Sequence, residues 1–294
     1  MAFAHMTHSS YVGRFAPTPT GPLHFGSLVA ALASYLDAKA HNGTWLLRIE
    51  DLDPPREDPA ASTVIPQQLK DHGLHWDADI QFQSEHSQRY EAALSQLAQS
   101  KHTFYCQCSR KQLAEHHGLH LGPCDTSHIE QAAIRLAVPD KTMSFVDQVY
   151  GTYSQNLLNQ VGDQVLKRKD GLYAYQLAVV VDDHHSGITH VVRGVDLLDN
   201  TPRQLFLMDC LGYDHPHYLH LPLVVNELGQ KLSKQNKAMA IEGQEAKQNL
   251  IKALEFLKQV VTPDMKQASI PQLLNQAVQN WDPSVIPADH SGLS

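Results

Sequence analysis

Residues 11–27 combine the features of a site that binds a nucleotide phosphate. The stretch opens on a strand pattern, breaks into a turn rich in proline and glycine, and runs into an apolar helix pattern near Leu28. The first turn of a helix presents unpaired backbone N–H groups and the positive end of the helix dipole, which attract phosphate oxygens. Gly26 permits a ligand to approach the backbone closely, and His24 can donate a hydrogen bond to a phosphate oxygen. The alternative is an ordinary strand, loop and helix with an incidental histidine.

A second candidate phosphate contact lies far downstream, in the sequence Lys231-Leu232-Ser233-Lys234. These two lysines follow a turn that contains glycine, and each carries a compact positive charge that suits a phosphate. Taken alone, the segment is typical of a lysine-rich surface loop. Its occurrence together with His24, which lies far upstream in the sequence, favours a role in phosphate binding.

Three of the four cysteines are clustered, and their spacing with a histidine is typical of a metal site. The candidate ligands, three sulfurs and one imidazole, are Cys106, Cys108, His120 and Cys124. An odd number of clustered cysteines, without a secretion signal, argues against disulfides, and this donor set suits tetrahedral Zn²⁺. We therefore expect one closed, structural zinc site. His116 and His117 are rival fourth ligands, and three reduced structural thiols are the alternative to a metal.

Composition limits the class of protein. The chain has 294 residues, of which 42% are hydrophobic and 18% charged, as in soluble globular proteins. No apolar run is long enough for a membrane span, and no secretory signal opens the chain, so the cytoplasm is the expected location. The net charge of −8 is unfavourable for a nucleic-acid partner, although the local field matters more than the sum. The basic run Lys167-Arg168-Lys169 is typical of a solvated surface.

The order of the predicted elements indicates a parallel sheet. A helix over residues 27–39, with Ser27 as its possible N-cap, separates the first strand from a second strand at residues 44–49. Such a strand–helix–strand unit implies a right-handed crossover, and ligands of these sheets lie beyond the carboxyl ends of the strands. We expect Arg14 and Glu50 there, because each falls near the end of its strand.

The rest of the chain is expected to form an insertion, the second half of the sheet and a helical end. Predicted helices lie within residues 62–100, from Thr201 onward, at 243–260 and at 268–280. Predicted strands lie at 103–105, 132–138, 144–149 and 190–194. Residues 171–181 are expected to belong to the core of the fold, and residues 182–189 to form a turn. The expected division is a flexible extension 1–10, a first catalytic half 11–102, a zinc-bearing insertion 103–165, a second catalytic half 166–236 and a helical cap 237–294.

The two phosphate-binding candidates resemble known motifs. H-x-G-x at residues 24–27 and K-L-S-K at residues 231–234 resemble the HIGH and KMSKS motifs of class I aminoacyl-tRNA synthetases. The sequences RFAPTPTGPLHFG and RIEDLD, at residues 14–26 and 48–53, narrow the resemblance to the glutamyl branch, over residues 11 to about 236. It implies an α/β fold: a Rossmann-like catalytic domain with a parallel sheet, an inserted zinc-bearing α+β subdomain and a short C-terminal helical region. Ser27 stands where the name-giving motif ends in histidine, and glutamyl enzymes tolerate small residues there.

The resemblance implies an ATP site between the two motifs, with Mg²⁺ accompanying the nucleotide. The implied ATP contacts are His24, Gly26, Ser27, Lys231 and Lys234, of which His24 and Lys234 are the catalytic pair. A carboxylate attacks the α-phosphate and pyrophosphate leaves, so catalysis consists of positioning and charge neutralisation. A general base is unnecessary because a carboxylic acid with a pKa of about 4 is already ionised.

The resemblance also implies a pocket for glutamate. Its residues are Arg14, Ala16, Thr18, Glu50, Tyr175 and Arg193. An arginine matches a carboxylate with two parallel hydrogen bonds, and Glu50 would take the α-amino group of the substrate. The alternative is that Glu50 and Arg193 belong to structural ion pairs.

About 58 residues follow Asn236, fewer than an anticodon-reading domain needs. With zinc ligands in the insertion, this pattern resembles the glutamyl-queuosine tRNA(Asp) synthetases, which activate glutamate with ATP in the absence of tRNA and transfer it to queuosine at the wobble position. The expected partners are ATP, L-glutamate and queuosine-bearing tRNA(Asp), and the expected state is a monomer without membrane contact. The alternatives are a truncated synthetase that charges the tRNA 3′ end, a nucleotidyltransferase of related fold, and a non-catalytic binding module.

Overall fold

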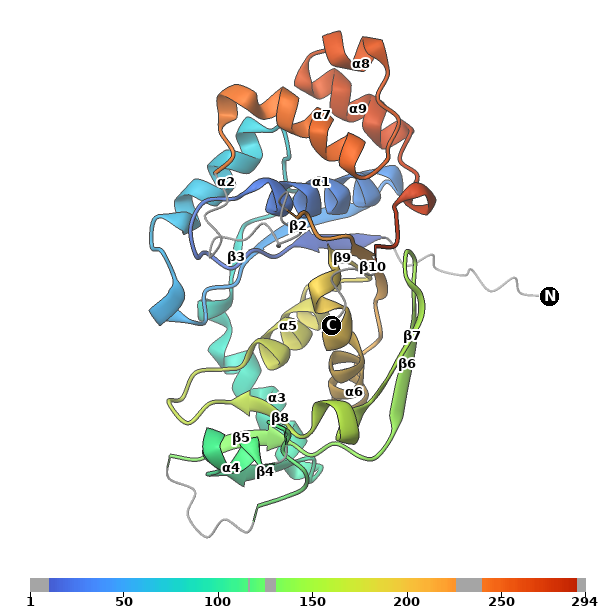
Figure 1. Ribbon diagram of the computed structural model, residues 1–294. Coiled ribbons are helices and arrows are strands. Elements are labelled where there is room, and N and C mark those ends of the chain that lie inside the picture. The colour runs from blue at the N-terminus through green and yellow to red at the C-terminus, as the bar shows by residue number, and fades with distance from the viewer. Residues whose placement is uncertain (1–10, 116, 125–130, 226–239, 290–294) are drawn as a thin grey trace, which may run out of the picture.

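A mostly parallel sheet assembled from distant parts of the chain forms the centre of the fold (Figure 1). The computed structural model describes residues 11–115, 117–124, 131–225 and 240–289. In spatial order the strands are β3 (Gln81–Phe82), β2 (Thr44–Ile49), β1 (Val12–Phe15), β9 (His190–Gly194), β10 (His217–Leu221), β6 (Thr142–Asp147) and β7 (Gly151–Asn156). The N–H of Thr189 donates to the carbonyl of Val12 (2.9 Å) and joins β9 to β1. The predicted strand at residues 11–15 is confirmed but begins at Val12, and those at residues 44–49 and 190–194 are confirmed with the same bounds.

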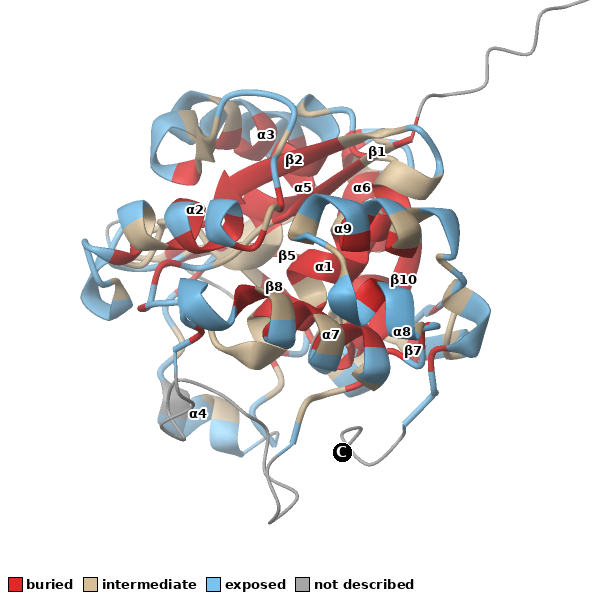
Figure 2. Cartoon of the chain, turned by 90° about the horizontal axis from the view of Figure 1, so that it is seen from above, coloured by how far each residue is buried: buried red, intermediate tan, exposed pale blue. Residues whose placement is uncertain are grey.

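Helices cover both faces of this sheet and bury its central strands β1, β2, β9 and β10. Helix α1 (Phe25–Ala40) covers one face, and α7 (Ala246–Phe256), α8 (Pro263–Gln267) and α9 (Ile270–Gln279) form an outer layer over it (Figure 1). Seen from above, strands β1 and β2 and helix α1 are largely buried, whereas the outer helices expose one side (Figure 2). Helices α3 (Ser87–Gln99), α5 (Tyr175–His185) and α6 (Thr201–Leu211) pack against the other face, and α2 (Ala61–Asp71) follows β2. Among the described residues, no helix is both long and apolar enough to cross a membrane.

The predicted start of the first helix is shifted, whereas that of α6 at Thr201 is confirmed. The prediction of Ser27 as an N-cap is wrong, because His24 caps α1 and its Nδ1 accepts the N–H of Ser27 (3.2 Å). Helix α6 already includes Thr201 and is preceded by Asn200, so Thr201 is its first residue. The predicted turn at residues 182–189 is also wrong in its first half, since α5 continues to His185 and only then turns.

The insertion has its own small antiparallel sheet, which lies at the far end of the molecule from the C-terminal helices (Figure 1). Its strands are β4 (Thr103–Cys106), β5 (Ala133–Leu136) and β8 (Gln164–Lys167), and the short helix α4 (Arg110–Ala114) follows β4. The hairpin of β6 and β7 returns to the central sheet, where Asp147 pairs with Tyr218. The division of the chain at residues 102, 165 and 236 stays a proposal.

Candidate active site

The six residues predicted for the glutamate pocket all line one cavity of about 360 Å³. They come from β1 and the turn after it, the residue after β2, the start of α5 and β9: Arg14, Ala16, Thr18, Glu50, Tyr175 and Arg193. The N–H of Glu50 donates to the carbonyl of Pro17 (3.0 Å), which holds this turn against the end of β2. The cavity therefore lies beyond the carboxyl ends of parallel strands, as the strand order predicts.

Arg14 and Glu50 of this glutamate cavity belong to a buried network of two arginines and two carboxylates. Asp183 accepts from Arg14 at Nε (3.1 Å) and Nη2 (3.3 Å), and from Nη1 of Arg48 (2.7 Å). Nη2 of Arg48 lies 3.3 Å from Glu50. Asp183 thus accepts from Nε and Nη2 of Arg14, the arginine that was expected to bind the substrate carboxylate. Nη1 is therefore the nitrogen of Arg14 left for a ligand.

Burial and neighbouring charges act in opposite directions on these carboxylates. Burial alone would raise the pKa of Asp183, but Arg14 and Arg48 outweigh it and hold that pKa below its usual range. For Glu50, burial wins and raises the pKa, although Arg48 and Arg14 pull it down. Glu50 is both part of a structural ion pair and a wall of the cavity, and an incoming ammonium group would favour its ionised form.

Arg193 reaches the same cavity from β9 with most of its guanidinium already bonded. Its Nε donates to Nε2 of His220 (3.1 Å), and its Nη2 donates to Oγ1 of Thr201 (2.8 Å) and to the carbonyl of Leu197 (3.2 Å). The guanidinium carbon lies 5.3 Å from the ring centre of Tyr218. Among the described residues no carboxylate forms an ion pair with Arg193, so its positive charge is available to a ligand.

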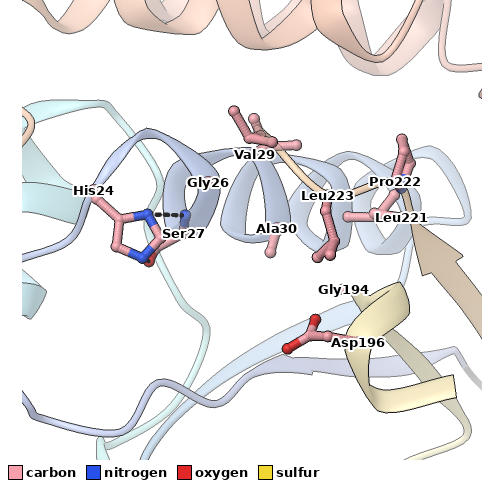
Figure 3. Close-up of a pocket in the computed structure, with 11 residues that line it drawn as sticks. His24, Gly26, Ser27, Val29, Ala30, Gly194, Asp196, Leu221, Pro222 and Leu223 are labelled. Atoms are coloured by element: carbon pink, nitrogen blue, oxygen red, sulfur yellow. Dashed lines mark hydrogen bonds between the residues drawn. The ribbon is translucent and has the colours of Figure 1, made fainter. Parts of the chain in front are cut away.

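The residues of the first motif line a second cavity, of about 200 Å³ (Figure 3). His24, Gly26 and Ser27 form one end of it, and Ala30 and Gly194 belong to the walls of both cavities. Because Nδ1 of His24 accepts from Ser27, a neutral ring carries its proton on Nε2, which lies 3.2 Å from Oγ of Ser27. The three residues thus lie together at the start of α1, as predicted.

Lys231 and Lys234 lie outside the described residues. The described residues on either side of that segment adjoin the His24 cavity. Val224 lines the cavity, Ala240 forms a β-bridge with His24, and the N–H of Ile241 donates to the carbonyl of Leu23 (3.0 Å). Both points at which the predicted lysine segment joins the described chain therefore lie beside the first motif.

The four predicted metal ligands converge in the insertion. The ligand atoms of Cys106, Cys108, His120 and Cys124 all lie within 4.8 Å of one another. Nε2 of His120 lies 3.0 Å from the sulfur of Cys124 and 3.7 Å from that of Cys108. Three thiols and one imidazole at such distances are the donor set of a tetrahedral zinc site. Of the rivals, His117 is exposed and outside this cluster, and His116 lies outside the described residues.

Asp163 orients the histidine of this cluster. Its Oδ2 accepts from Nδ1 of His120 (2.8 Å) and from the N–H of Gly122 (2.8 Å), and its Oδ1 accepts from the N–H of Val138 (2.9 Å). A proton on Nδ1 leaves the lone pair of Nε2 for a metal, the arrangement that metal-binding histidines commonly have. Gly162, at φ 72°, packs so closely that a Cβ there would lie 2.8 Å from the backbone of His120.

The basic run at residues 167–169 is paired rather than simply solvated. Lys167 pairs with Glu91, Arg168 with Asp53 and Asp170, and Lys169 donates to the carbonyls of Gln107 (2.7 Å) and Cys108 (3.2 Å). Arg168 also lines a third cavity, of about 460 Å³, together with Asp53 and Tyr173. Its walls include Thr18, Glu50, Arg56 and Tyr175, so this third cavity adjoins the glutamate cavity.

Sequence reasoning missed Arg48, Asp183, Asp147 and His220. Arg48 had a usable signal, because a charged residue inside an otherwise apolar strand next to Glu50 calls for a buried partner. Asp183 follows an apolar run and was assigned to a turn, so its burial was unexpected. Nothing in the sequence links Asp147 with His220, which are 73 positions apart.

The parallel sheet, the histidine-capped first helix and the ligand cavities at the strand ends define the catalytic domain of a class I tRNA synthetase. The family described as "tRNA synthetases class I (E and Q), catalytic domain" matches residues 11–126 and 125–276. A crystal structure of a glutamate tRNA ligase from Elizabethkingia meningosepticum, in complex with its amino acid, has the same fold, with a TM-score of 0.80 at 24% identity. The likeness covers 95% of this chain and 66% of that one.

Relatives of higher sequence identity show to which branch of this family the chain belongs. A glutamyl-Q tRNA(Asp) synthetase of Pseudomonas putida is 51% identical over 283 residues, which cover 96% of this chain and 94% of the relative. One of Pseudomonas aeruginosa is 51% identical over 281 residues, covering 95% and 96%. The chain belongs to the class I glutamyl and glutaminyl tRNA synthetase family, in the branch of the glutamyl-Q tRNA(Asp) synthetases.

Proposed function

We propose that this protein activates L-glutamate with ATP, in the absence of tRNA, and transfers the glutamyl group to the queuosine base at the wobble position of tRNA(Asp). The observation that carries the proposal is the adjacency of two cavities. A cavity with three arginines and one buried glutamate shares Ala30 and Gly194 with the cavity of His24. An amino acid in the first would place its α-carboxylate toward a nucleotide phosphate in the second.

In the glutamate cavity, charge selects the substrate. Arg14 and Arg193 each keep one guanidinium nitrogen for a carboxylate, and Glu50 faces the cavity to take the ammonium group. Arg14 and Arg56 pair with Asp183 and Asp53, whereas Arg193 has no carboxylate partner among the described residues, so a substrate of net charge −1 compensates its charge. Glutamine, whose side chain is neutral, would leave one positive charge uncompensated.

In the activation step, an α-carboxylate oxygen of glutamate forms a bond to the α-phosphorus of ATP as the bond to pyrophosphate breaks. His24 would donate to the phosphates, and Lys231 and Lys234 would neutralise the departing pyrophosphate. Mg²⁺ would enter with the ATP phosphates and supply further neutralisation. Among the described residues, the cysteine and histidine cluster of the insertion is the only group of three or more potential ligands, so no carboxylate cluster competes for Mg²⁺.

The third cavity suits the acceptor nucleoside. It shares Glu50, Thr18, Arg56 and Tyr175 with the glutamate cavity. Arg56 and Arg168, which both pair with Asp53 in this cavity, would contact RNA phosphates. In the transfer step a queuosine hydroxyl attacks the glutamyl carbonyl carbon, the bond to the phosphate oxygen breaks, and AMP leaves. We further propose that zinc, held by Cys106, Cys108, His120 and Cys124, fixes the fold of the insertion. A monomer in the cytoplasm belongs to the same proposal.

The test offers labelled glutamate and ATP to tRNA(Asp) with and without queuosine. Label should enter only the queuosine-bearing tRNA and should remain after enzymatic removal of the 3′-terminal nucleotide. Label confined to the 3′ end would instead identify a synthetase that charges the acceptor stem.

A second assay separates the remaining alternatives. Without tRNA, exchange of pyrophosphate into ATP should depend on glutamate and should be lost in Lys234→Ala. A nucleotidyltransferase would show no dependence on glutamate. A binding module would show no exchange at all, with or without the substitution.

A further inference from the structure

A chain of buried groups leads from the β6–β7 hairpin to the guanidinium of Arg193. Asp147, the last residue of β6, accepts four hydrogen bonds. Its Oδ1 accepts from the N–H groups of Val149 (3.0 Å) and Tyr150 (2.9 Å). Its Oδ2 accepts from the N–H of His220 (3.0 Å) and from the ring Nδ1 of His220 (2.7 Å). The ring then accepts Nε of Arg193 at its other nitrogen, at 3.1 Å.

The donor and acceptor roles of these three side chains fix the position of each proton between them. Nε of Arg193 can only donate, so Nε2 of His220 must carry a lone pair. The proton of the ring is then on Nδ1, where Oδ2 of Asp147 accepts it. The opposite tautomer would place an N–H against an N–H at Arg193. Asp147 therefore sets the tautomer of His220, and the tautomer sets the orientation of Arg193.

The surroundings of His220 keep the ring neutral. Burial and the charge of Arg193 together lower its pKa to about 4, although the hydrogen bond and the charge of Asp147 and the charge of Asp196 act in the other direction. Both His220 and Asp147 are fully enclosed, and Tyr218 stacks on the ring. At neutral pH the ring is thus a hydrogen-bond acceptor toward Arg193 and not a competing cation.

We infer that Asp147 and His220 are positioning residues for the amino acid substrate, because they determine which edge of Arg193 faces the glutamate cavity. Nε is held by His220 and Nη2 by Thr201, which leaves Nη1 for a substrate carboxylate. The inference rests on the proposed function of this cavity. The inference also connects the β6–β7 hairpin, which follows β5 in the sequence, with amino acid binding, because β6 pairs with β10.

The competing interpretation is that Asp147 and His220 only join β6 to β10. A purely structural pair would change stability and leave the glutamate KM intact. Three variants separate the two roles. His220→Leu removes both ring nitrogens, whereas His220→Gln keeps one donor and one acceptor on a single carbon. His72→Leu is the matched control, since His72 is also fully buried and bonds a backbone carbonyl (2.7 Å) on α2, outside the three cavities.

The glutamate KM and the ATP KM are measured by glutamate-dependent pyrophosphate exchange. His220→Leu should raise the glutamate KM at least about tenfold and leave the ATP KM unchanged, because a hydrogen bond to a charged group is lost. His220→Gln should recover most of this loss, and His72→Leu should leave both KM values unchanged. An unchanged glutamate KM in folded His220→Leu, or equal effects of Leu and Gln, would overturn the inference.

Nitrogen NMR of histidine-labelled protein tests the same inference without activity, and it remains decisive where His220→Leu does not fold. The signal of His220 is assigned by its loss in His220→Gln, and it should show a proton on Nδ1 and a bare Nε2, the same tautomer that His72 and His120 adopt. A proton on Nε2 of His220 would refute the inference whatever the kinetics. Native protein that shows no glutamate-dependent exchange would instead refute the proposed function, which the NMR result does not address.

Discussion

At the scale of single residues, Asp183 is the carboxylate on which Arg14 of the glutamate cavity and the buried Arg48 converge. An isolated charge in such an enclosed place would be costly, and each member of the network is stable only while its partners remain. Asp183 therefore has two roles. It compensates Arg14 and Arg48, and it occupies one side of Arg14 so that Nη1 is presented to the cavity.

Replacement of Asp183 by asparagine should lower the free energy of unfolding by about 3 kcal/mol, because two buried guanidinium groups lose their shared anion. Urea unfolding at neutral pH measures this. The matched control is Asp209→Asn, which removes a half-exposed pair with His215 and should change stability by no more than about 0.5 kcal/mol. Equal effects of the two substitutions would contradict the role of Asp183.

His220 gives stability a specific dependence on pH. Its pKa is about 4 in the folded protein and lies below the ordinary value of 6.5. As pH falls below about 6.5 the unfolded chain takes up a proton that the folded chain refuses, so stability is lost between these two values. The slope from this residue approaches about 1.4 kcal/mol per pH unit. Urea unfolding at pH 7, 6 and 5 should show a shallower slope in His220→Gln, and an unchanged slope would contradict the assignment.

Sequence reasoning reached the site residues that belong to recognisable motifs, and it failed where function depends on distant pairing. Arg14, Glu50 and Arg193 were predicted from motif context, and all three line one cavity. Arg48 and Asp183 are 135 positions apart, and nothing in either local sequence indicates the contact. The same holds for Arg193 and His220, whose side chains meet only because β9 and β10 are adjacent.

At the scale of elements, the end of α5 and the polar strands were the hardest to predict. Asp182 and Asp183 are typical turn residues, yet both are buried at the end of the helix because Tyr90, Gln83 and Arg14 bond them. Strands β7 and β8 are short and largely polar, and their pairing with β6 and β5 defines them. Strand β2, by contrast, is a continuous run buried on both faces, and its predicted bounds were confirmed.

The loop before β8 supports the proposed zinc site through Gly162. A side chain at Gly162 would meet the backbone of His120 at 2.8 Å in a conformation, φ 72°, that already disfavours it. Gly162→Ala should therefore displace His120 and reduce bound zinc well below one ion per chain, as measured by atomic absorption. Gly212→Ala is the control, because Gly212 has a similar φ of 71° with nothing within 4 Å of the added carbon. Equal zinc content in the two variants would contradict the role of Gly162.

At the scale of the whole molecule, an acidic protein is proposed to bind RNA. The net charge is −8, yet Arg56 and Arg168 both line the third cavity. Transfer to tRNA should therefore weaken about tenfold between roughly 50 and 200 mM salt, the change expected for about two phosphate contacts. Pyrophosphate exchange, which needs no tRNA, should change far less. A double Arg56→Ala, Arg168→Ala variant should show a reduced salt dependence, and an unaltered one would contradict this placement of the RNA.

The three cavities form a row that begins at His24 and ends at Arg168, with the glutamate cavity between them. The most direct test of this order is a crystal structure with a nonhydrolysable analogue of glutamyl-adenylate. The account predicts the phosphate beside His24 and Lys234, and the glutamyl carboxylate within hydrogen-bond distance of Arg14 or Arg193. An analogue bound away from these residues would contradict it.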